Sequence, residues 1–178
     1  MYKVREAKLE DAERIADIHV KSWKSTYSEL INEQDMSNIT YDNRKVLWET
    51  ILCMPNENQP ALVIVDNKER IVGFISGGKE RTKRFGYDGE IYAIYLLEEY
   101  QRKGLGSMLL ESFATAMKQS GYQSLLVWVL TKNPSNRFYK DYGAKQLEKE
   151  ETTIGKGTYQ ETAYGWDDID DLLLKFNK

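Results

Sequence analysis

A glycine-containing turn is the first feature of this sequence that could do chemistry. It follows an apolar run typical of a β-strand and consists of Gln101, Arg102, Lys103, Gly104, Leu105, Gly106 and Ser107. The two glycines permit a tight strand-to-helix turn and let a ligand approach the backbone without meeting a Cβ. The first turn of the following helix leaves unpaired N–H groups and a partial positive charge, to which Arg102 and Lys103 add. The turn therefore predicts an anion site suited to a pyrophosphate.

This turn does not match the standard nucleotide motifs. A P-loop ends in Gly-Lys-Ser/Thr, and a dinucleotide fold needs a third glycine and an early first strand. The sequence therefore disfavours ATP and NAD. A turn with only structural glycines remains open, because any tight strand-to-helix connection favours glycine.

Glu90 and Tyr139 are the two candidates for acid–base chemistry near the turn. Glu90 lies in an apolar strand, where an acid is unfavourable unless it is paired or used. It is either a functional acid or an exposed strand-end carboxylate paired with Lys79 or Arg81. Tyr139 is either a functional phenol or a core aromatic, because it shares a helical stripe with its aromatic neighbours.

The elements that must position these residues follow from the hydrophobic pattern. Strands are expected at residues 3–7, 61–65, 71–75, 90–96, 124–130, 144–153 and 158–166. Helices are expected at residues 10–27, 41–52, from Leu105 to Gly121, and from a cap at Asn133 to Gly143. The strand at 124–130 is expected to run parallel to that at 90–96 through a right-handed crossover. The sequence thus predicts an α+β fold with a mixed, mostly antiparallel sheet of about seven strands and about four helices.

Composition restricts the class of protein. The 178 residues, 41% of them hydrophobic, suit a single domain spanning 1–178. The single cysteine, Cys53, can form no internal disulfide, and no leader or membrane span is evident, so a cytoplasmic location is expected. The net charge of -3 gives no overall positive field for nucleic acid, and no membrane partner is indicated. The acidic run at 167–171 is expected to be a solvated face.

The turn and its surroundings resemble the GNAT family of N-acetyltransferases. Residues 100–106 resemble the family signature Gln/Arg-x-x-Gly-x-Gly/Ala, and the order of elements resembles the family over nearly the whole chain. The resemblance implies acetyl-CoA as cosubstrate, with Gln101 and residues Arg102 through Ser107 at its phosphates. It also implies that the backbone of Ile94, Tyr95 and Leu96 aligns the pantetheine arm like an added strand.

The same resemblance assigns chemistry to Glu90. In the histone-acetylating branch, a strand glutamate eleven residues before the signature glutamine acts as general base, and Glu90 has this separation from Gln101. An ammonium near ~10.4 and a carboxylate near ~4.3 differ by about 6 pKa units, or roughly 8 kcal/mol. Burial and the like charge of Asp88 would make Glu90 a stronger base, and a water chain could carry the proton.

Tyr139 is the general acid that the resemblance implies. Residues 133–139 resemble the family segment Asn-Pro-x-x-x-Phe-Tyr, whose tyrosine binds the CoA sulfur. A phenol near ~10 protonates a thiolate near ~8.5 at a cost of about 2 kcal/mol, so late proton transfer is expected. Asn133 caps its helix, contacts the pantetheine amide, or does both. The oxyanion donor is expected to be a backbone N–H near Ile94 or Leu96.

The function expected from these features is direct acetyl transfer from acetyl-CoA to a primary amine in a ternary complex. Cys53 has no histidine in a recognisable motif, so a covalent intermediate is disfavoured. A non-catalytic acyl-CoA-binding module is the alternative. The acceptor, a small-molecule or peptide amine, is unidentified, and its pocket is expected from residues 23–60 and 155–161, with Trp23 and Tyr27 as possible borders. Homodimers are common in the family, no metal site is indicated, and His19 is expected to be packed and hydrogen-bonded.

Overall fold

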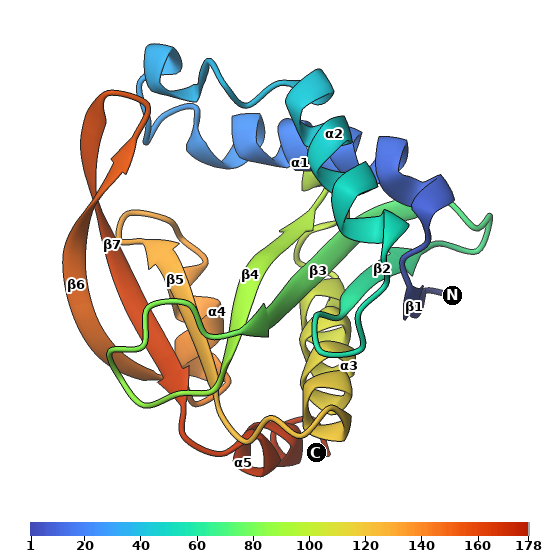
Figure 1. The fold of residues 1–178 in the computed structure, drawn as a ribbon, viewed down its shortest axis with the longest axis vertical. Helices are drawn as coiled ribbons and strands as arrows, with labels where there is room; N and C mark the ends of the chain where they lie inside the picture. The colour runs from blue at the N-terminus through green and yellow to red at the C-terminus, as the bar shows by residue number, and fades with distance from the viewer. Residues whose placement is uncertain (178) are drawn as a thin grey trace.

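A seven-stranded mixed sheet forms the centre of the protein in a computed structural model that describes residues 1–177 (Figure 1). Its strands are β1 (Lys3–Glu6), β2 (Ala61–Val65), β3 (Ile71–Lys79), β4 (Gly89–Leu96), β5 (Leu125–Leu130), β6 (Lys145–Ile154) and β7 (Gly157–Trp166). Their order is β1-β2-β3-β4-β5-β7-β6. Only β4 and β5 pair in parallel, and every other neighbouring pair is antiparallel. The predicted α+β class and the predicted parallel pair are both confirmed.

Two apolar cores cover the two faces of this sheet. The α-helices are α1 (Ala12–Tyr27), α2 (Tyr41–Cys53), α3 (Leu105–Gln119), α4 (Asn136–Asp141) and α5 (Ile169–Leu174), with short 3-10 turns η1 (Leu9–Asp11), η2 (Glu33–Met36) and η3 (Glu98–Tyr100). In one core α3 and α5 pack on the sheet, and in the other α1 and α2 do. Figure 1 shows α1 and α2 together, away from α3 and α5. None of the described helices is long and apolar enough to cross a bilayer.

The last two helices differ from the predicted set, although the four aspartates of the 167–171 run are exposed as expected. The acidic run at 167–171 contains the start of α5, where the Asp168 carboxylate accepts a hydrogen bond from the Asp170 N–H and Ile169 is buried. The described residues therefore hold five α-helices, whereas about four were expected. The helix α4 begins at Asn136, three residues after the predicted cap. Asn133 instead closes a preceding turn, because its Oδ1 accepts from the Ser135 N–H at 2.9 Å.

The parting of β4 and β5 is the feature of the sheet that matters most for function. Their parallel pairing covers only three residues of each strand, Gly89 to Ile91 against Leu125 to Val127. The β3–β4 register also shifts between Ser76 and Gly77, where β4 contains one extra residue. Beyond Ile91, the edge of β4 that faces β5 has no strand partner. An open wedge therefore forms between two central strands.

The polar insert between α1 and β2 reaches the β6–β7 hairpin. Asp35 in η2 accepts hydrogen bonds from the Lys156 N–H at 3.1 Å and from the Tyr159 hydroxyl. A Cβ on Gly157 would lie 2.2 Å from an Asp35 carboxylate oxygen, so this contact requires glycine there. The two segments expected to build an acceptor pocket are thus joined by Asp35.

Candidate active site

A cavity of about 650 Å³ occupies the wedge between β4 and β5. Its walls come from β4, β5, the end of α1, the glycine turn, the start of α3 and helix α4. The predicted site residues that line it are Ile94, Tyr95, Leu96, Gln101, Arg102, Gly104, Gly106, Ser107, Asn133 and Tyr139. Of the remaining predicted residues, Lys103 lies over the Tyr100 ring, Leu105 is in the core, and Glu90 is buried beside the cavity. One concave site therefore collects most of the candidates.

The start of α3 forms one wall of this cavity. Gly104 is the N-cap residue and has φ 79°, a left-handed conformation that favours glycine. Arg102 also has positive φ, at 61°. The first helical bond of this turn is from Met108 N–H to the Gly104 carbonyl, at 3.3 Å. The N–H groups of residues 105–107 therefore stay available for an anionic ligand, as the helix geometry requires.

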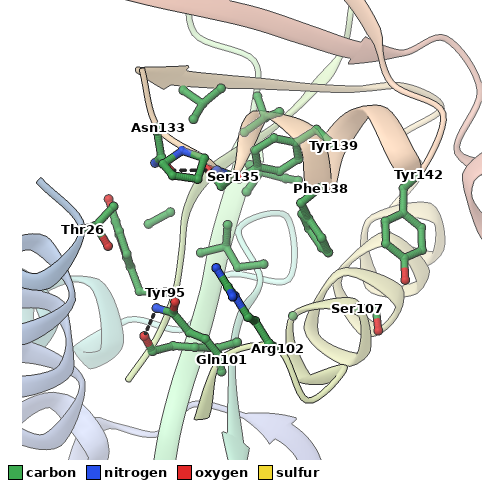
Figure 2. A pocket seen from close by; sticks show the side chains of 18 of the residues that line it. Thr26, Tyr95, Gln101, Arg102, Ser107, Asn133, Ser135, Phe138, Tyr139 and Tyr142 are labelled. Carbon is green, nitrogen blue, oxygen red and sulfur yellow. Dashed lines mark hydrogen bonds between the residues drawn. The ribbon is translucent and has the colours of Figure 1, made fainter. Parts of the chain in front are cut away.

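The opposite wall is formed by α4 and its aromatic side chains. Figure 2 shows Phe138 and Tyr139 on this helix, across the pocket from Gln101 and Arg102 on the turn. A Cβ on Gly106 would lie 3.7 Å from the Phe138 ring, an ordinary contact distance. Gln101 is fixed toward β4, because its Nε2 donates to the Leu96 carbonyl at 3.2 Å. Turn, strand and helix therefore enclose one slot of suitable shape for a long, narrow ligand.

Tyr139 lies at the inner end of this slot. The side chain is 4% exposed, and within residues 1–177 its hydroxyl makes no side-chain hydrogen bond. Burial, followed by the neighbouring Tyr27, raises the pKa of Tyr139 above its ordinary value. The phenol is therefore protonated at neutral pH and can donate a hydrogen bond to a ligand atom in the cavity.

Glu90 has one dominant partner. Its side chain is 1% exposed. The carboxylate forms an ion pair with Arg81, in which Oε2 lies 2.7 Å from the guanidinium Nη2. Oε1 accepts from the Arg81 backbone N–H at 3.0 Å. The Arg81 guanidinium in turn lies 4.1 Å from the ring centre of Tyr92, which lines the cavity. Glu90 is thus buried and not exposed at a strand end, and of the two partners considered for it, Lys79 and Arg81, it pairs with Arg81.

Asp88 does not face Glu90 as expected. It precedes β4, and its carboxylate accepts hydrogen bonds from the N–H groups of Gln123 and Ser124 and from the Ser124 hydroxyl. Burial opposes its charge, but these hydrogen bonds prevail and lower the pKa of Asp88. Its charge is satisfied at the start of β5, so it does not strengthen Glu90 as a base.

Trp128 is a cavity residue that lies outside the predicted set of site residues. Its side chain lines the cavity, and its Nε1 is buried without a hydrogen-bond partner in the described part of the chain. Phe85 and the Arg84 guanidinium lie 6.0 and 5.4 Å from its ring. On the adjacent strand β7, burial and then Glu150 raise the pKa of Glu161. The alternation of apolar residues along β5 did not predict that the face with Trp128 is partly polar.

His19 is packed as expected. It is 6% exposed, and its Nδ1 accepts a hydrogen bond from the Trp48 indole at 3.1 Å. Burial, and secondarily the charge of Arg44, lowers the pKa of His19 to about 4. The imidazole is therefore neutral at pH 7 and belongs to the core between α1, α2 and β4.

Comparison with known proteins assigns the family. Residues 14–144 match the acetyltransferase (GNAT) family, and the chain is 38% identical over 178 residues to the uncharacterized N-acetyltransferase YuaI of Bacillus subtilis, covering 100% of both chains. It is 26% identical over 147 residues to a spermidine N(1)-acetyltransferase of Thermoplasma acidophilum, covering 80% of this chain and 88% of that protein. The crystal structure of PaiA N-acetyltransferase from Thermoplasma acidophilum with coenzyme A superposes with a TM-score of 0.67 at 21% identity, covering 93% and 98% of the chains.

This protein belongs to the GNAT acetyltransferase family, and the expected family is confirmed. Its seven-stranded sheet, with a parting between β4 and β5, has the fold of its structural relatives.

Proposed function

We propose that this protein transfers an acetyl group from acetyl-CoA to a primary amine by direct attack in a ternary complex. One observation carries the proposal: a single cavity is lined both by the start of α3 and by Tyr139 on α4. The first is suited to a pyrophosphate and the second to a leaving sulfur. The relatives named as N-acetyltransferases support the same activity.

The proposed donor site uses the residues around the wedge. The N–H groups of residues 105–107, with Arg102 and Ser107 beside them, would hold the phosphates. The free edge of β4 at residues 94–96 would bind the pantetheine amides, as strand addition does. Lys103 would add charge at the rim of the site, outside the cavity lining. Asn133 would bind the inner end of the pantetheine arm or keep its neighbours in place.

The proposed reaction forms a nitrogen–carbon bond and breaks the carbon–sulfur bond, while the amine loses a proton and the sulfur gains one. The neutral amine nitrogen attacks the thioester carbonyl carbon, the carbon–sulfur bond breaks, and the sulfur leaves with the electron pair. The amine proton passes through water toward Glu90, and Tyr139 donates a hydrogen bond to the sulfur, which takes up a proton from a phenol of the cavity as it leaves. The ordinary pKa of an amine lies about 6 units above that of a carboxylate, so direct proton transfer to Glu90, which is buried and bound to Arg81, is demanding. A water relay that ends in solvent lowers that demand.

The side chains around one side of the cavity support an amine as the acceptor. Tyr92 and Trp128 line the cavity, and outside the lining Glu161 lies on the neighbouring strand β7, whereas Glu150 on β6 is already paired with Arg84 at 2.6 Å. Aromatic and acidic groups together favour a cation. This supports an amine that arrives as an ammonium and loses its proton in the site.

The test is release of free thiol from acetyl-CoA over a panel of amines that includes polyamines, aminoglycosides, amino acids and a peptide N-terminus. We expect at least one amine to give release, together with thermal stabilisation by acetyl-CoA and CoA. A non-catalytic acyl-CoA-binding module would be stabilised but would release no thiol with any amine. Stabilisation by ATP alone would exclude the proposed donor.

A further inference from the structure

Two buried polar residues from distant parts of the chain meet in the cavity. Tyr27 is the last residue of α1 and is 7% exposed, and Asn133 follows β5 and is 8% exposed. The Asn133 Nδ2 donates to the Tyr27 hydroxyl oxygen at 3.3 Å, although the two residues are 106 positions apart. Both line the same cavity as Tyr139.

The direction of this hydrogen bond is fixed by the amide's other contact. The Asn133 Oδ1 already accepts from the Ser135 N–H at 2.9 Å, so the side chain must present its NH₂ group to Tyr27. The Tyr27 oxygen is therefore an acceptor. Asn133 does not use the Tyr27 proton, which can therefore be donated to the Tyr95 hydroxyl or to a ligand atom in the cavity.

Tyr27 and Tyr139 differ in how well each could lose a proton. Within residues 1–177 no side-chain donor supports the Tyr139 oxygen, so a phenolate there would be buried without stabilisation. Burial also raises the pKa of Tyr27, but hydrogen bonding from Tyr95 and Asn133 acts in the opposite direction. A negative charge is therefore better tolerated on the Tyr27 oxygen than on that of Tyr139.

We propose that Tyr27, held in place by Asn133, is the phenol that gives its proton to the leaving sulfur, whereas Tyr139 only donates a hydrogen bond to it. This inference rests on the proposed acetyl transfer. As the carbon–sulfur bond breaks, its electron pair goes to sulfur and the Tyr27 proton follows. Tyr139 keeps its proton and stabilises the sulfur by a hydrogen bond. The Tyr27 phenolate, bound by the Asn133 amide, regains a proton from water before the next turnover.

The first experiment is the Tyr27→Phe variant with steady-state kinetics and direct CoA binding. We expect kcat to fall about tenfold or more, with less than a twofold change in the dissociation constant of CoA. Tyr41→Phe is the matched control, because Tyr41 is 39% exposed at the start of α2 and lies outside the cavity lining. An unchanged kcat in Tyr27→Phe would overturn the proposal.

A second experiment separates proton donation from packing. Incorporation of 3,5-difluorotyrosine at position 27 keeps the ring and the hydroxyl but lowers the pKa of the phenol. The alkaline limb of the kcat profile should then move to lower pH. The titratable groups that face Tyr27 are Tyr95 on β4 and Tyr139 on α4, so the same replacement at 139 is the comparison. A profile that moves only with position 139 would refute a role for the Tyr27 proton.

The outcomes also separate this inference from the proposed function. If the unmodified protein releases no thiol with any amine, the proposed transfer itself fails. If it releases thiol and Tyr27→Phe is equally fast, only the role of Tyr27 fails. If Tyr27→Phe loses its fold, as judged by its melting temperature, the difluorotyrosine protein still decides the question.

Discussion

Arg81 neutralises the buried carboxylate of Glu90 through both its guanidinium and its backbone N–H. The Arg81 Nη2 lies 2.7 Å from Oε2 of Glu90, and the Arg81 backbone nitrogen lies 3.0 Å from Oε1. Arg81 is 62% exposed at its side chain, whereas Glu90 is 1% exposed. The pair thus joins a buried acid on β4 to a loop at the surface, and the aromatic ring of Tyr92 connects it to the cavity.

The first prediction concerns the charge of Glu90. Glu90→Gln keeps the shape of the side chain and removes its capacity to take a proton. We expect kcat to fall about a hundredfold, the range of a lost general base, while the KM for acetyl-CoA stays within about threefold. The measurement is the pH profile of thiol release.

Glu151→Gln on β6 is the control for this variant, because Glu151 is exposed. It should keep the rate of the unmodified protein. A Glu90→Gln protein with unmodified rate and profile would assign Glu90 a structural role only, as the buried partner of Arg81.

The second prediction concerns Tyr139. Removing its hydroxyl in Tyr139→Phe leaves the ring packed on Phe138 and Trp166. We expect kcat to fall about a hundredfold, because the departing sulfur loses a hydrogen-bond donor, with little change in CoA affinity. Stopped-flow thiol release and calorimetric CoA binding give the two values. Equal losses in rate and affinity would place the hydroxyl at CoA binding instead.

The third prediction separates the anion cradle from ordinary helix termination. Gly104 at the start of α3 and Gly121 after its end have φ of 79° and 97°, and a Cβ on either would meet no atom within 4 Å. Alanine at each position should therefore cost about 1 kcal/mol of unfolding free energy through backbone strain alone. Only Gly104→Ala should also weaken acetyl-CoA binding, measured by thermal shift at increasing ligand concentration.

Gly121→Ala serves as the control with matched strain. If the affinity for CoA falls by the same factor in both variants, general destabilisation explains the fall and the turn is not the phosphate site. If CoA affinity is unchanged in both variants, CoA binding does not depend on the backbone conformation of Gly104.

The fourth prediction concerns stability at acid pH. The pKa of His19 is about 4 in the folded protein, against 6.5 ordinarily, because the imidazole is buried. Between pH 6.5 and 4, His19 therefore binds a proton in the unfolded chain but not in the folded protein. Stability should fall as pH drops from 6.5 to 4, by about 3 kcal/mol from this group. Urea unfolding across this range measures it.

His19→Gln is the variant that isolates this effect. Its side-chain oxygen can still accept from the Trp48 indole, but glutamine does not titrate. The loss of stability from pH 6.5 to 4 should be smaller in His19→Gln than in the unmodified protein. Parallel pH curves would show that His19 titrates normally in the fold.

Local patterns predicted most of the elements, because each depends on neighbours in the sequence. The β-branched runs at 61–65 and 71–75 form β2 and β3, and glycine at 104 begins α3 as the turn chemistry requires. The aspartates of the 167–171 run are exposed as predicted, but helix α5 was missed, because the capping role of Asp168 is visible only when Ile169 is seen to be buried. The N-cap of α4 was placed two residues early, at Asn133 instead of Ser135, because Asn133 fits both a cap and an isolated turn.

The sequence by itself determined the family, the strand order near the glycine turn and the residue types available for an anion and a thiolate. The tertiary structure decided which of them meet. The parting of β4 from β5, the pairing of Glu90 with Arg81 and the contact of Tyr27 with Asn133 all depend on how distant elements pack. Periodicity states which face of an element is apolar, but it carries no information on which polar groups the packed faces bring together.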